Sequence, residues 1–166
     1  MAAFALYKEG IMRIYGSWEE IFPYDAPERA DKILEECDDI CRELGFGGLW
    51  LLMGTCLGIV RDGGYIQDDN DLDIGPKCSE EELEKFMEKL IENGYLRDGT
   101  SSHFYKYGIL VDLRSFTNLS NHPFEVFTEI VYKGRAYRIP KLIDEYLRNY
   151  YGDWRIQKPK NPTNKY

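Results

Sequence analysis

The chain has 166 residues, of which 43% are hydrophobic and 30% are charged, a balance typical of one globular domain. This composition excludes a disordered, collagen-like or membrane-spanning chain. With 21 Lys and Arg against 29 Asp and Glu, the net charge is −8, which disfavours diffuse binding to DNA or RNA. We therefore expect no nucleic-acid partner and no transmembrane segment, and any phosphate must bind at a local site.

The cysteines and the first residues bear on the location of the protein. The four cysteines form no CxxC pair, and Lys8 and Glu9 interrupt the only early apolar stretch. A secretory signal needs an unbroken apolar stretch, so we expect reduced thiols and a cytoplasmic location.

No repeat, low-complexity block or flexible linker divides the chain, so we expect one domain over residues 1–166. Residues 1–26 are aromatic and irregular and are interpreted as an N-terminal extension. Residues 155–166 carry several Lys and Arg without an acidic residue and are interpreted as a basic tail.

The first clear element is a helix that begins near Pro27. Apolar residues recur at intervals of three, four and seven, and Gly45 stands just past the last one. This spacing is typical of an amphipathic helix that buries one stripe. The stripe consists of Ile33, Leu34, Cys37, Ile40, Cys41 and Leu44.

Two apolar runs follow this helix. Residues 49–53 are continuously apolar between glycines, which predicts a strand buried on both faces. Residues 56–60 lead to a pair of glycines, which predicts a short helix closed by a turn. Gly54 and Thr55 lie where this helix begins, and small residues there let backbone N–H groups approach a phosphate.

The second half of the chain alternates helix and strand patterns. Ser79 and the glutamates after it predict the start of a helix, whereas Pro140 is expected to open a last one. Four strands are predicted between these helices, the last two as a hairpin: 103–107, 109–116, 124–132 and 135–139. The apolar faces of the two helices are Leu83, Phe86, Met87, Leu90 and Ile91, then Leu142, Ile143, Tyr146, Leu147 and Tyr150. The fold class that follows is α+β, with a small mixed sheet flanked by helices.

The pair Asp71 and Asp73 is the first candidate for chemistry. The two residues are spaced by two in a predicted strand, so both carboxylates project from one face while Leu72 and Ile74 point into the core. Two adjacent anions are tolerated when a divalent cation lies between them, and Mg²⁺ (or Mn²⁺) needs only one or two protein carboxylates plus substrate phosphates. A solvated acidic loop or a calcium site is the alternative interpretation.

Asp112 is the candidate third carboxylate. Val111 and Leu113 flank it in an apolar strand, where an unpaired charge would be costly. Arg114 shares its face and could either neutralise Asp112 or contact a phosphate beside the metal. Residues Asp71, Asp73 and Asp112 are therefore predicted as metal ligands and catalytic residues.

The region from Gly54 to Asp73 resembles the LicD family, which includes bacterial phosphocholine transferases and fukutin-related proteins. The resemblance rests on the stretches LMGTCLGIVR at 52–61 and GYIQDDNDLDI at 64–74, and continues to YYGDW at 150–154. Two departures are that the chain has Gln67 and Asp68 where the family has an aromatic residue before the acidic run, and Asn70 where it has an aspartate. Both flank the predicted ligands, so we expect altered contact with the acceptor.

The resemblance implies a nucleotidyltransferase-like fold and an activity. The implied reaction is the metal-dependent transfer of a phospho-alcohol, such as phosphocholine, from a CDP-alcohol to a hydroxyl of a sugar or polyol acceptor, with release of CMP. Gly54, Thr55 and Arg61 would contact the phosphates of the nucleotide-linked donor, although Arg61 could instead be a helix C-terminal cation paired with Asp62. Tyr65 is a candidate for contact with a cationic alcohol because aromatic rings bind quaternary ammonium groups.

Two rival functions remain open at this point. The first is a nucleotidyltransferase that moves NMP from an NTP to a small hydroxyl compound such as an antibiotic, since the same three carboxylates serve both reactions. The second is a non-catalytic module that has kept the fold. The leaving group, CMP or pyrophosphate, separates the two reactions.

Overall fold

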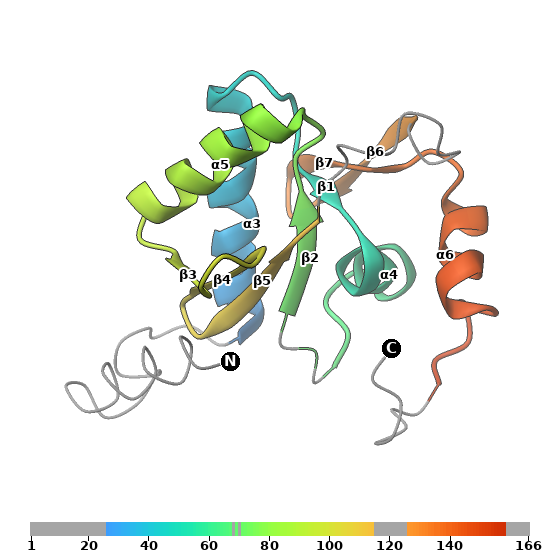
Figure 1. The fold of residues 1–166 in the computed structure, drawn as a ribbon. Coiled ribbons are helices and arrows are strands. Elements are labelled where there is room, and N and C mark those ends of the chain that lie inside the picture. Colours follow the sequence, from blue (N-terminus) through green and yellow to red (C-terminus); the bar gives the residue numbers. More distant parts are fainter. Residues whose placement is uncertain (1–25, 68, 70, 115–125, 159–166) are drawn as a thin grey trace.

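The computed structural model describes residues 26–67, 69, 71–114 and 126–158. Figure 1 shows the order of their helices and strands. Parts of the chain named above lie outside these residues: the predicted extension as far as residue 25, the single residues Asp68 and Asn70, and the end of the basic tail. The elements are α3 (Ala26–Glu43), β1 (Trp50–Leu51), α4 (Met53–Asp62), β2 (Asp71–Gly75), α5 (Glu80–Glu92), β3 (Leu96–Arg97), β4 (His103–Lys106), β5 (Ile109–Leu113), β6 (Phe127–Tyr132), β7 (Arg135–Pro140) and α6 (Ile143–Tyr151).

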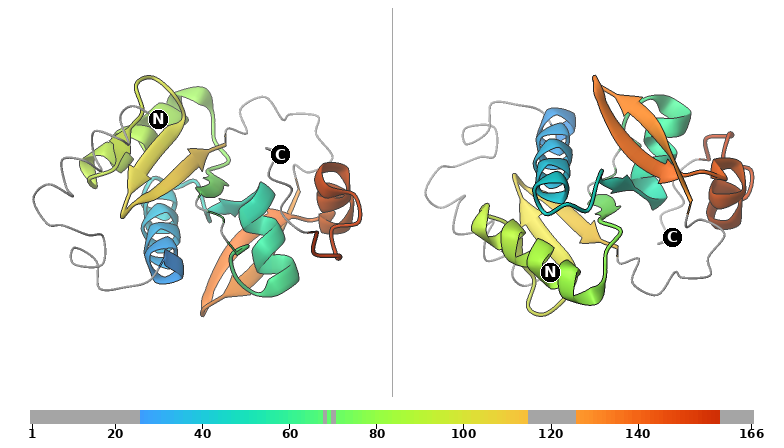
Figure 2. Two further views of the ribbon diagram at one scale, coloured as in Figure 1. Left: turned by 90° about the horizontal axis from the view of Figure 1, so that it is seen from below. Right: turned by 90° about the horizontal axis from the view of Figure 1, so that it is seen from above.

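The strands form one seven-stranded sheet in the order β3-β4-β5-β2-β1-β7-β6. The pairs β2–β5 and β1–β7 are parallel and the other neighbouring pairs are antiparallel, so the sheet is mixed as predicted. Helices α3 and α5 lie on one side of the sheet, and α4 and α6 lie on the other (Figures 1 and 2). None of the helices in the described residues is long and apolar enough to span a membrane.

Helix α3 buries the stripe predicted from its spacing. Its buried apolar residues run along one side, and Leu44, the last predicted member, follows the end of the helix and is partly buried. The buried set is Ala30, Ile33, Leu34, Cys37, Ile40 and Cys41.

All four cysteines are free, and burial raises the pKa of the Cys37 thiol to about 12. Cys37, Cys41 and Cys56 are therefore protonated core residues, whereas Cys78 is only partly buried.

Helix α5 begins at the predicted cap. The Ser79 hydroxyl accepts from the Glu82 backbone N–H at 3.3 Å, and the Glu82 carboxylate accepts from the Ser79 N–H at 2.8 Å, which completes a capping box. The prediction was wrong for Ile91, which is 50% exposed. The buried stripe is limited to Phe86, Met87 and Leu90, because α5 meets the rest of the protein over a narrow face.

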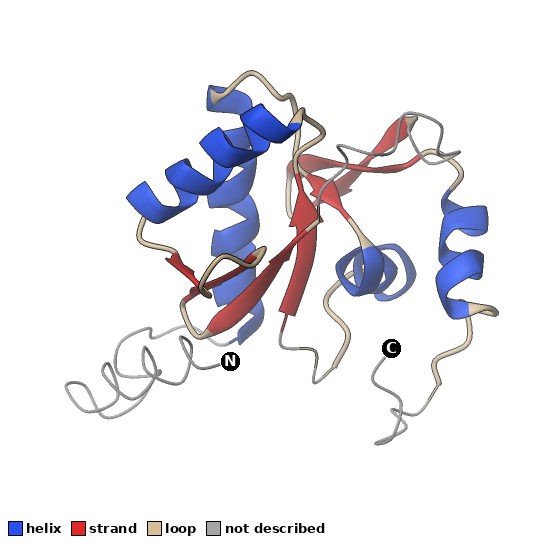
Figure 3. Ribbon diagram, in the orientation of Figure 1, coloured by secondary structure: helices blue, strands red, loops and turns tan. Residues whose placement is uncertain are grey.

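The chain between β1 and α4 differs from the prediction. Strand β1 covers only two residues, because Met53 turns into a left-handed conformation (φ 41°) and begins α4. The Met53 N–H donates to the Tyr146 hydroxyl at 3.0 Å. Gly54 and Thr55 consequently lie inside the first turn of α4, and α4 lies beside the sheet (Figure 3).

The last helix also starts later than predicted. Pro140 ends β7, where it pairs with Phe127, and α6 begins at Ile143. Leu142 and Tyr150 are 48% and 50% exposed, so the predicted apolar side was too wide. The helix packs through Tyr146 and Leu147, and Tyr146 is the side chain that holds the start of α4.

Two carboxylates of helix α3 form hydrogen bonds and ion pairs with the β4–β5 hairpin and with the region of β1 and β7. Glu36 accepts from the Tyr107 hydroxyl at 2.6 Å and from Lys106 at 2.6 Å, which secures the β4–β5 hairpin. Asp38, fully buried, accepts from the Leu49 N–H at 2.8 Å and pairs with Arg135 at the start of β7. These bonds satisfy charges that would otherwise be costly to bury, and they hold the elements around the site in place.

Candidate active site

The parallel pairing of β2 with β5 brings the three predicted carboxylates together. Asp73 lies opposite Asp112 and Asp71 lies opposite Leu110 in the register of the two strands. Residues opposite each other in adjacent strands point to the same face, and residues two apart in one strand do so as well. Asp71, Asp73 and Asp112 therefore share the face that α4 covers, whereas Leu72 and Ile74 are buried on the other.

Arg114 spans two of these carboxylates. Its Nη2 atom lies 2.8 Å from Asp73 Oδ1 and 2.8 Å from Asp112 Oδ2, and its Nε lies 3.0 Å from Asp73 Oδ1. His103, the cross-strand partner of Asp112, places Nε2 at 3.7 Å from Asp112 Oδ1. The sequence left two roles open for Arg114, neutralisation of Asp112 or contact with a phosphate. The observed ion pairs neutralise Asp112 and also Asp73.

The start of α4 is bonded to the Asp73 residue. The Gly54 N–H donates to Asp73 Oδ2 at 3.3 Å, and the Thr55 hydroxyl accepts from the Asp73 backbone N–H at 2.9 Å. Asp73 is only 7% exposed, and this burial raises the pKa of its carboxyl group, with the bonds from Arg114 acting in the opposite direction. The charges of Asp71 and Asp112 also raise that pKa.

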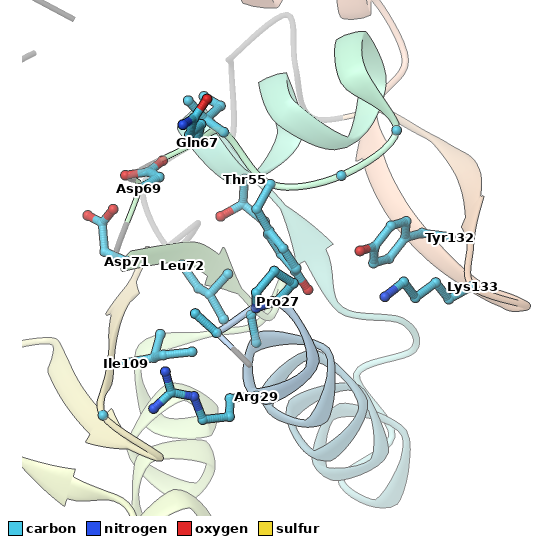
Figure 4. Close-up of a pocket in the computed structure, with 18 residues that line it drawn as sticks. Pro27, Arg29, Thr55, Gln67, Asp69, Asp71, Leu72, Ile109, Tyr132 and Lys133 are labelled. Atoms are coloured by element: carbon cyan, nitrogen blue, oxygen red, sulfur yellow. The ribbon is translucent and has the colours of Figure 1, made fainter. Parts of the chain in front are cut away.

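A cavity of about 650 Å³ lies next to this cluster (Figure 4). Four of the predicted site residues line it: Gly54, Thr55, Tyr65 and Asp71. Asp73, Asp112, Arg61 and Arg114 do not line the cavity. The candidate site thus has two neighbouring parts, the cavity and the cluster of carboxylates with Arg114, which meet at Gly54.

Asp69 is a further acidic residue of the cavity. A Cβ atom built on Gly54 would lie 3.0 Å from Asp69 Oδ2 and 3.6 Å from Asp73 Oδ2, so both carboxylates approach the start of α4. Asp69 also lines the cavity with Asp71. The signal was present in the sequence, since Asp69, Asp71 and Asp73 continue the same spacing of two.

This close approach predicts the effect of Gly54→Ala. The added methyl group would crowd the Asp69 carboxylate at 3.0 Å and meet the Asp73 carboxylate at an ordinary contact distance of 3.6 Å, whereas Gly54 has no left-handed φ that would strain an alanine. We expect the free energy of unfolding to change by less than about 1 kcal/mol, because alanine favours a helix. Turnover should fall by roughly tenfold or more, since small displacements of reacting groups are costly.

The control for that variant is Gly64→Ala. Gly64 also lines the cavity, but a Cβ atom there meets no described atom within 4 Å. Thermal unfolding and steady-state rates of both variants supply the comparison. Equal activity of Gly54→Ala and Gly64→Ala would show that the space between the two carboxylates is not used.

Tyr65 is held by Asp31, which the sequence reasoning did not single out. The Tyr65 and Tyr132 hydroxyls donate to Asp31 Oδ1 at 2.7 and 3.1 Å, and Lys133 pairs with Oδ2 of the same carboxylate. Burial first, and then the bond to Asp31, raises the pKa of Tyr65. The phenol is therefore neutral, and Tyr65 offers its ring to the cavity. No local pattern marks Asp31, because its partners come from distant elements.

Arg61 makes the contacts expected of a helix C-terminal cation paired with Asp62, the alternative to contact with a phosphate. It lies in the last turn of α4, pairs with both carboxylate oxygens of Asp62 at 2.9 and 2.7 Å, and donates to the Trp154 carbonyl at 3.3 Å. The Trp154 indole N–H donates in turn to Asp144 of α6 at 3.1 Å. Arg61 thus connects α4 to the YGDW segment.

The start of the basic tail packs on α6 instead of on the cavity. Arg155 pairs with Asp144 at 2.6 Å and lies over the Trp154 ring, and Lys158 donates to the Tyr151 carbonyl at 3.2 Å. Lys160 and Lys165 lie outside the described residues.

The oxygen atoms of the carboxylates fit a metal ion in part. Within the described residues, no group of three or more His, Cys, Asp and Glu side chains is arranged to hold one. The Asp71 and Asp73 carboxylates nevertheless share a face and supply hard oxygen ligands, and magnesium commonly binds one or two carboxylates and completes its shell with phosphate oxygens and water. These two residues fit that limited requirement, and the magnesium (or manganese) site stays a prediction.

Comparison with protein-family models finds no match for this chain, and comparison with curated proteins finds none either. The assignment of a function therefore depends on the arrangement of the residues described above and on the resemblance of the sequence motifs.

Proposed function

We propose that this chain is a metal-dependent transferase. It would move a phospho-alcohol group, such as phosphocholine, from a CDP-alcohol to a hydroxyl of a sugar or polyol acceptor and release CMP. The observation that carries the proposal is the register of β2 with β5, which sets Asp73 beside Asp112 at the first turn of α4. The donor class comes from the resemblance of residues 52–74 to the LicD family, whose nucleotidyltransferase-like fold is part of the same proposal.

Asp71 and Asp73 are the residues that would hold Mg²⁺ or Mn²⁺, and Asp112 is the proposed third carboxylate. When bound, the metal would neutralise the charge of the donor diphosphate and lower the pKa of the acceptor hydroxyl. The buried Asp73 is kept in place by Gly54 and Thr55, so its position does not depend on the substrate. This preorganisation favours a reaction that requires an in-line arrangement of acceptor and phosphorus.

The cavity supports a donor of nucleotide size. Its volume of about 650 Å³ falls in the range of small-molecule sites, and it extends from Asp71 to Lys133 and Arg29 (Figure 4). The buried Nε of Arg29 has no hydrogen-bond partner among the described residues. A diphosphate near Asp71 leaves the rest of the donor in a cavity with aromatic and cationic walls, which suits a ligand with further polar and anionic groups.

The test is a mass-spectrometric assay of the purified chain with Mg²⁺ and a sugar or polyol mixture. CDP-choline, CDP-ethanolamine and CDP-glycerol are offered separately, and the four NTPs are offered in parallel. We expect CMP from a CDP-alcohol, with an acceptor heavier by the phospho-alcohol, and no pyrophosphate from any NTP.

Two other outcomes would contradict this proposal. Pyrophosphate with a nucleotidylated acceptor would assign the chain as a nucleotidyltransferase. Binding of a CDP-alcohol without turnover, across the acceptor mixture, would favour the non-catalytic module. Asp73→Asn serves as the inactive reference, and Asp39→Asn, which alters a carboxylate that is 66% exposed on α3, controls for loss of one charge.

A further inference from the structure

We propose that Arg114 is a built-in counter-ion that competes with a divalent cation for Asp73 and Asp112. This inference rests on the proposed function, because it concerns the metal that Asp71 and Asp73 would hold. It goes further in assigning one side chain of the protein the control of cation affinity.

The Arg114 guanidinium bonds both carboxylates at once. One guanidinium nitrogen, Nη2, lies 2.8 Å from an oxygen of each carboxylate, and Nε adds a second bond to Asp73 at 3.0 Å. Charge-assisted bonds of this kind are among the stronger ones in proteins. Asp73 is nearly buried and stands next to Asp112, so without a cation the two charges would repel each other at high cost.

A metal ion needs the same carboxylate oxygens that Arg114 bonds. A cation that takes ligands from both Asp73 and Asp112 would use carboxylate lone pairs that Arg114 now occupies. Two cationic groups held on the same two carboxylates would also repel each other. Binding of the metal through this pair is therefore coupled to release of the guanidinium.

The Arg114 side chain can leave the carboxylates without unfolding the sheet. Its side chain is 47% exposed, whereas its backbone N–H is bonded to the Ile74 carbonyl at 2.8 Å. The guanidinium can turn toward solvent while its Cα stays at the end of β5. The released guanidinium stays beside the site and can bind an anionic phosphate. Arg114 would then neutralise the carboxylates in one position of its side chain and contact a phosphate in another.

The test is calorimetric titration of the purified chain with Mn²⁺ alone. Arg114→Met removes the charge and keeps the length of the side chain. We expect it to bind Mn²⁺ roughly tenfold more tightly than the wild type, within the usual range for coupled sites. The metal-free variant should also melt at a lower temperature, and Mn²⁺ should raise its melting temperature more than that of the wild type.

Two further variants accompany it. Arg114→Lys keeps a charge but has no counterpart of the Nε atom that adds the second bond to Asp73, so its Mn²⁺ affinity should lie between those of the wild type and Arg114→Met. It also provides the measurement if the methionine variant does not fold. Arg148→Met, which removes an equal charge from a side chain 60% exposed on α6, should bind Mn²⁺ as the wild type does.

The results distinguish this inference from the proposed function. Mn²⁺ affinities that are equal to or weaker than the wild type in both Arg114 variants would overturn the competition, even if CMP is released from a CDP-alcohol. Tighter binding in those variants, together with no CMP release by the wild type, would support the competition and count against the transferase. Absence of Mn²⁺ binding in every variant would overturn the competition together with the metal site.

Discussion

Replacing Asp71 or Asp73 by asparagine is expected to lower the rate of CMP release by roughly 10³-fold, because metal-assisted charge stabilisation contributes several kcal/mol to such reactions. Asparagine keeps the shape of the side chain, so folding should survive. The rise in melting temperature that Mg²⁺ or Mn²⁺ produces in the wild type should disappear in both variants, since the cation would lose a ligand. Differential scanning calorimetry and the mass-spectrometric assay measure the two effects.

The same assay determines which residue is the third carboxylate. Asp112→Asn and Asp69→Asn are compared directly, since Asp112 lies beside Asp73 in the sheet and Asp69 lies near it across Gly54. A loss of roughly 10²-fold in only one of them identifies the functional residue. Wild-type activity and metal response in both Asp71→Asn and Asp73→Asn would show that the site is assigned wrongly.

Gly75→Ala is expected to have the largest effect on stability. A Cβ atom on Gly75 would lie 2.1 Å from the Arg114 carbonyl oxygen and 3.2 Å from its carbonyl carbon, both backbone atoms. The strands β2 and β5 would have to separate just where they hold the carboxylates. We expect a loss of about 3 kcal/mol in the free energy of unfolding, which for this chain length lowers the melting temperature by roughly 10 °C.

The matched control is Gly48→Ala. Gly48 is also buried, but a Cβ atom there would meet its nearest neighbours, in Arg138 and Arg42, at 3.5 Å, an ordinary contact distance. Its stability should stay within about 1 kcal/mol of the wild type. Equal stability of the two variants in urea unfolding would contradict the close contact between Gly75 of β2 and the Arg114 backbone.

Several features could be predicted because they depend on neighbours in the chain. The spacing of apolar residues gives the buried side of α3, and Ser79 with Glu82 gives the start of α5. The alternation in Asp71-Leu72-Asp73 places both carboxylates on one face of β2. Each of these patterns is complete within a few residues, so no knowledge of distant partners is needed.

Local patterns were less informative where a distant partner decides the outcome. Leu142 and Tyr150 continue the helical spacing of α6 but are half exposed, because only Tyr146 and Leu147 face a neighbouring element closely. Met53 extends an apolar run, yet it begins α4, where its N–H donates to Tyr146. An apolar residue in the right register is buried only if another element covers it.

The helical and strand periods, the acidic run and the small residues at the start of α4 can all be recognised in the amino-acid sequence. Their meeting in space depends on the folded chain: β2 and β5 pair so that Asp73 lies opposite Asp112, Arg114 bonds both, and Asp31 of α3 holds Tyr65. The physical reason is that strand register and side-chain pairing join residues far apart in the chain. Such contacts depend on how the whole sheet and its helices pack, which no local spacing encodes.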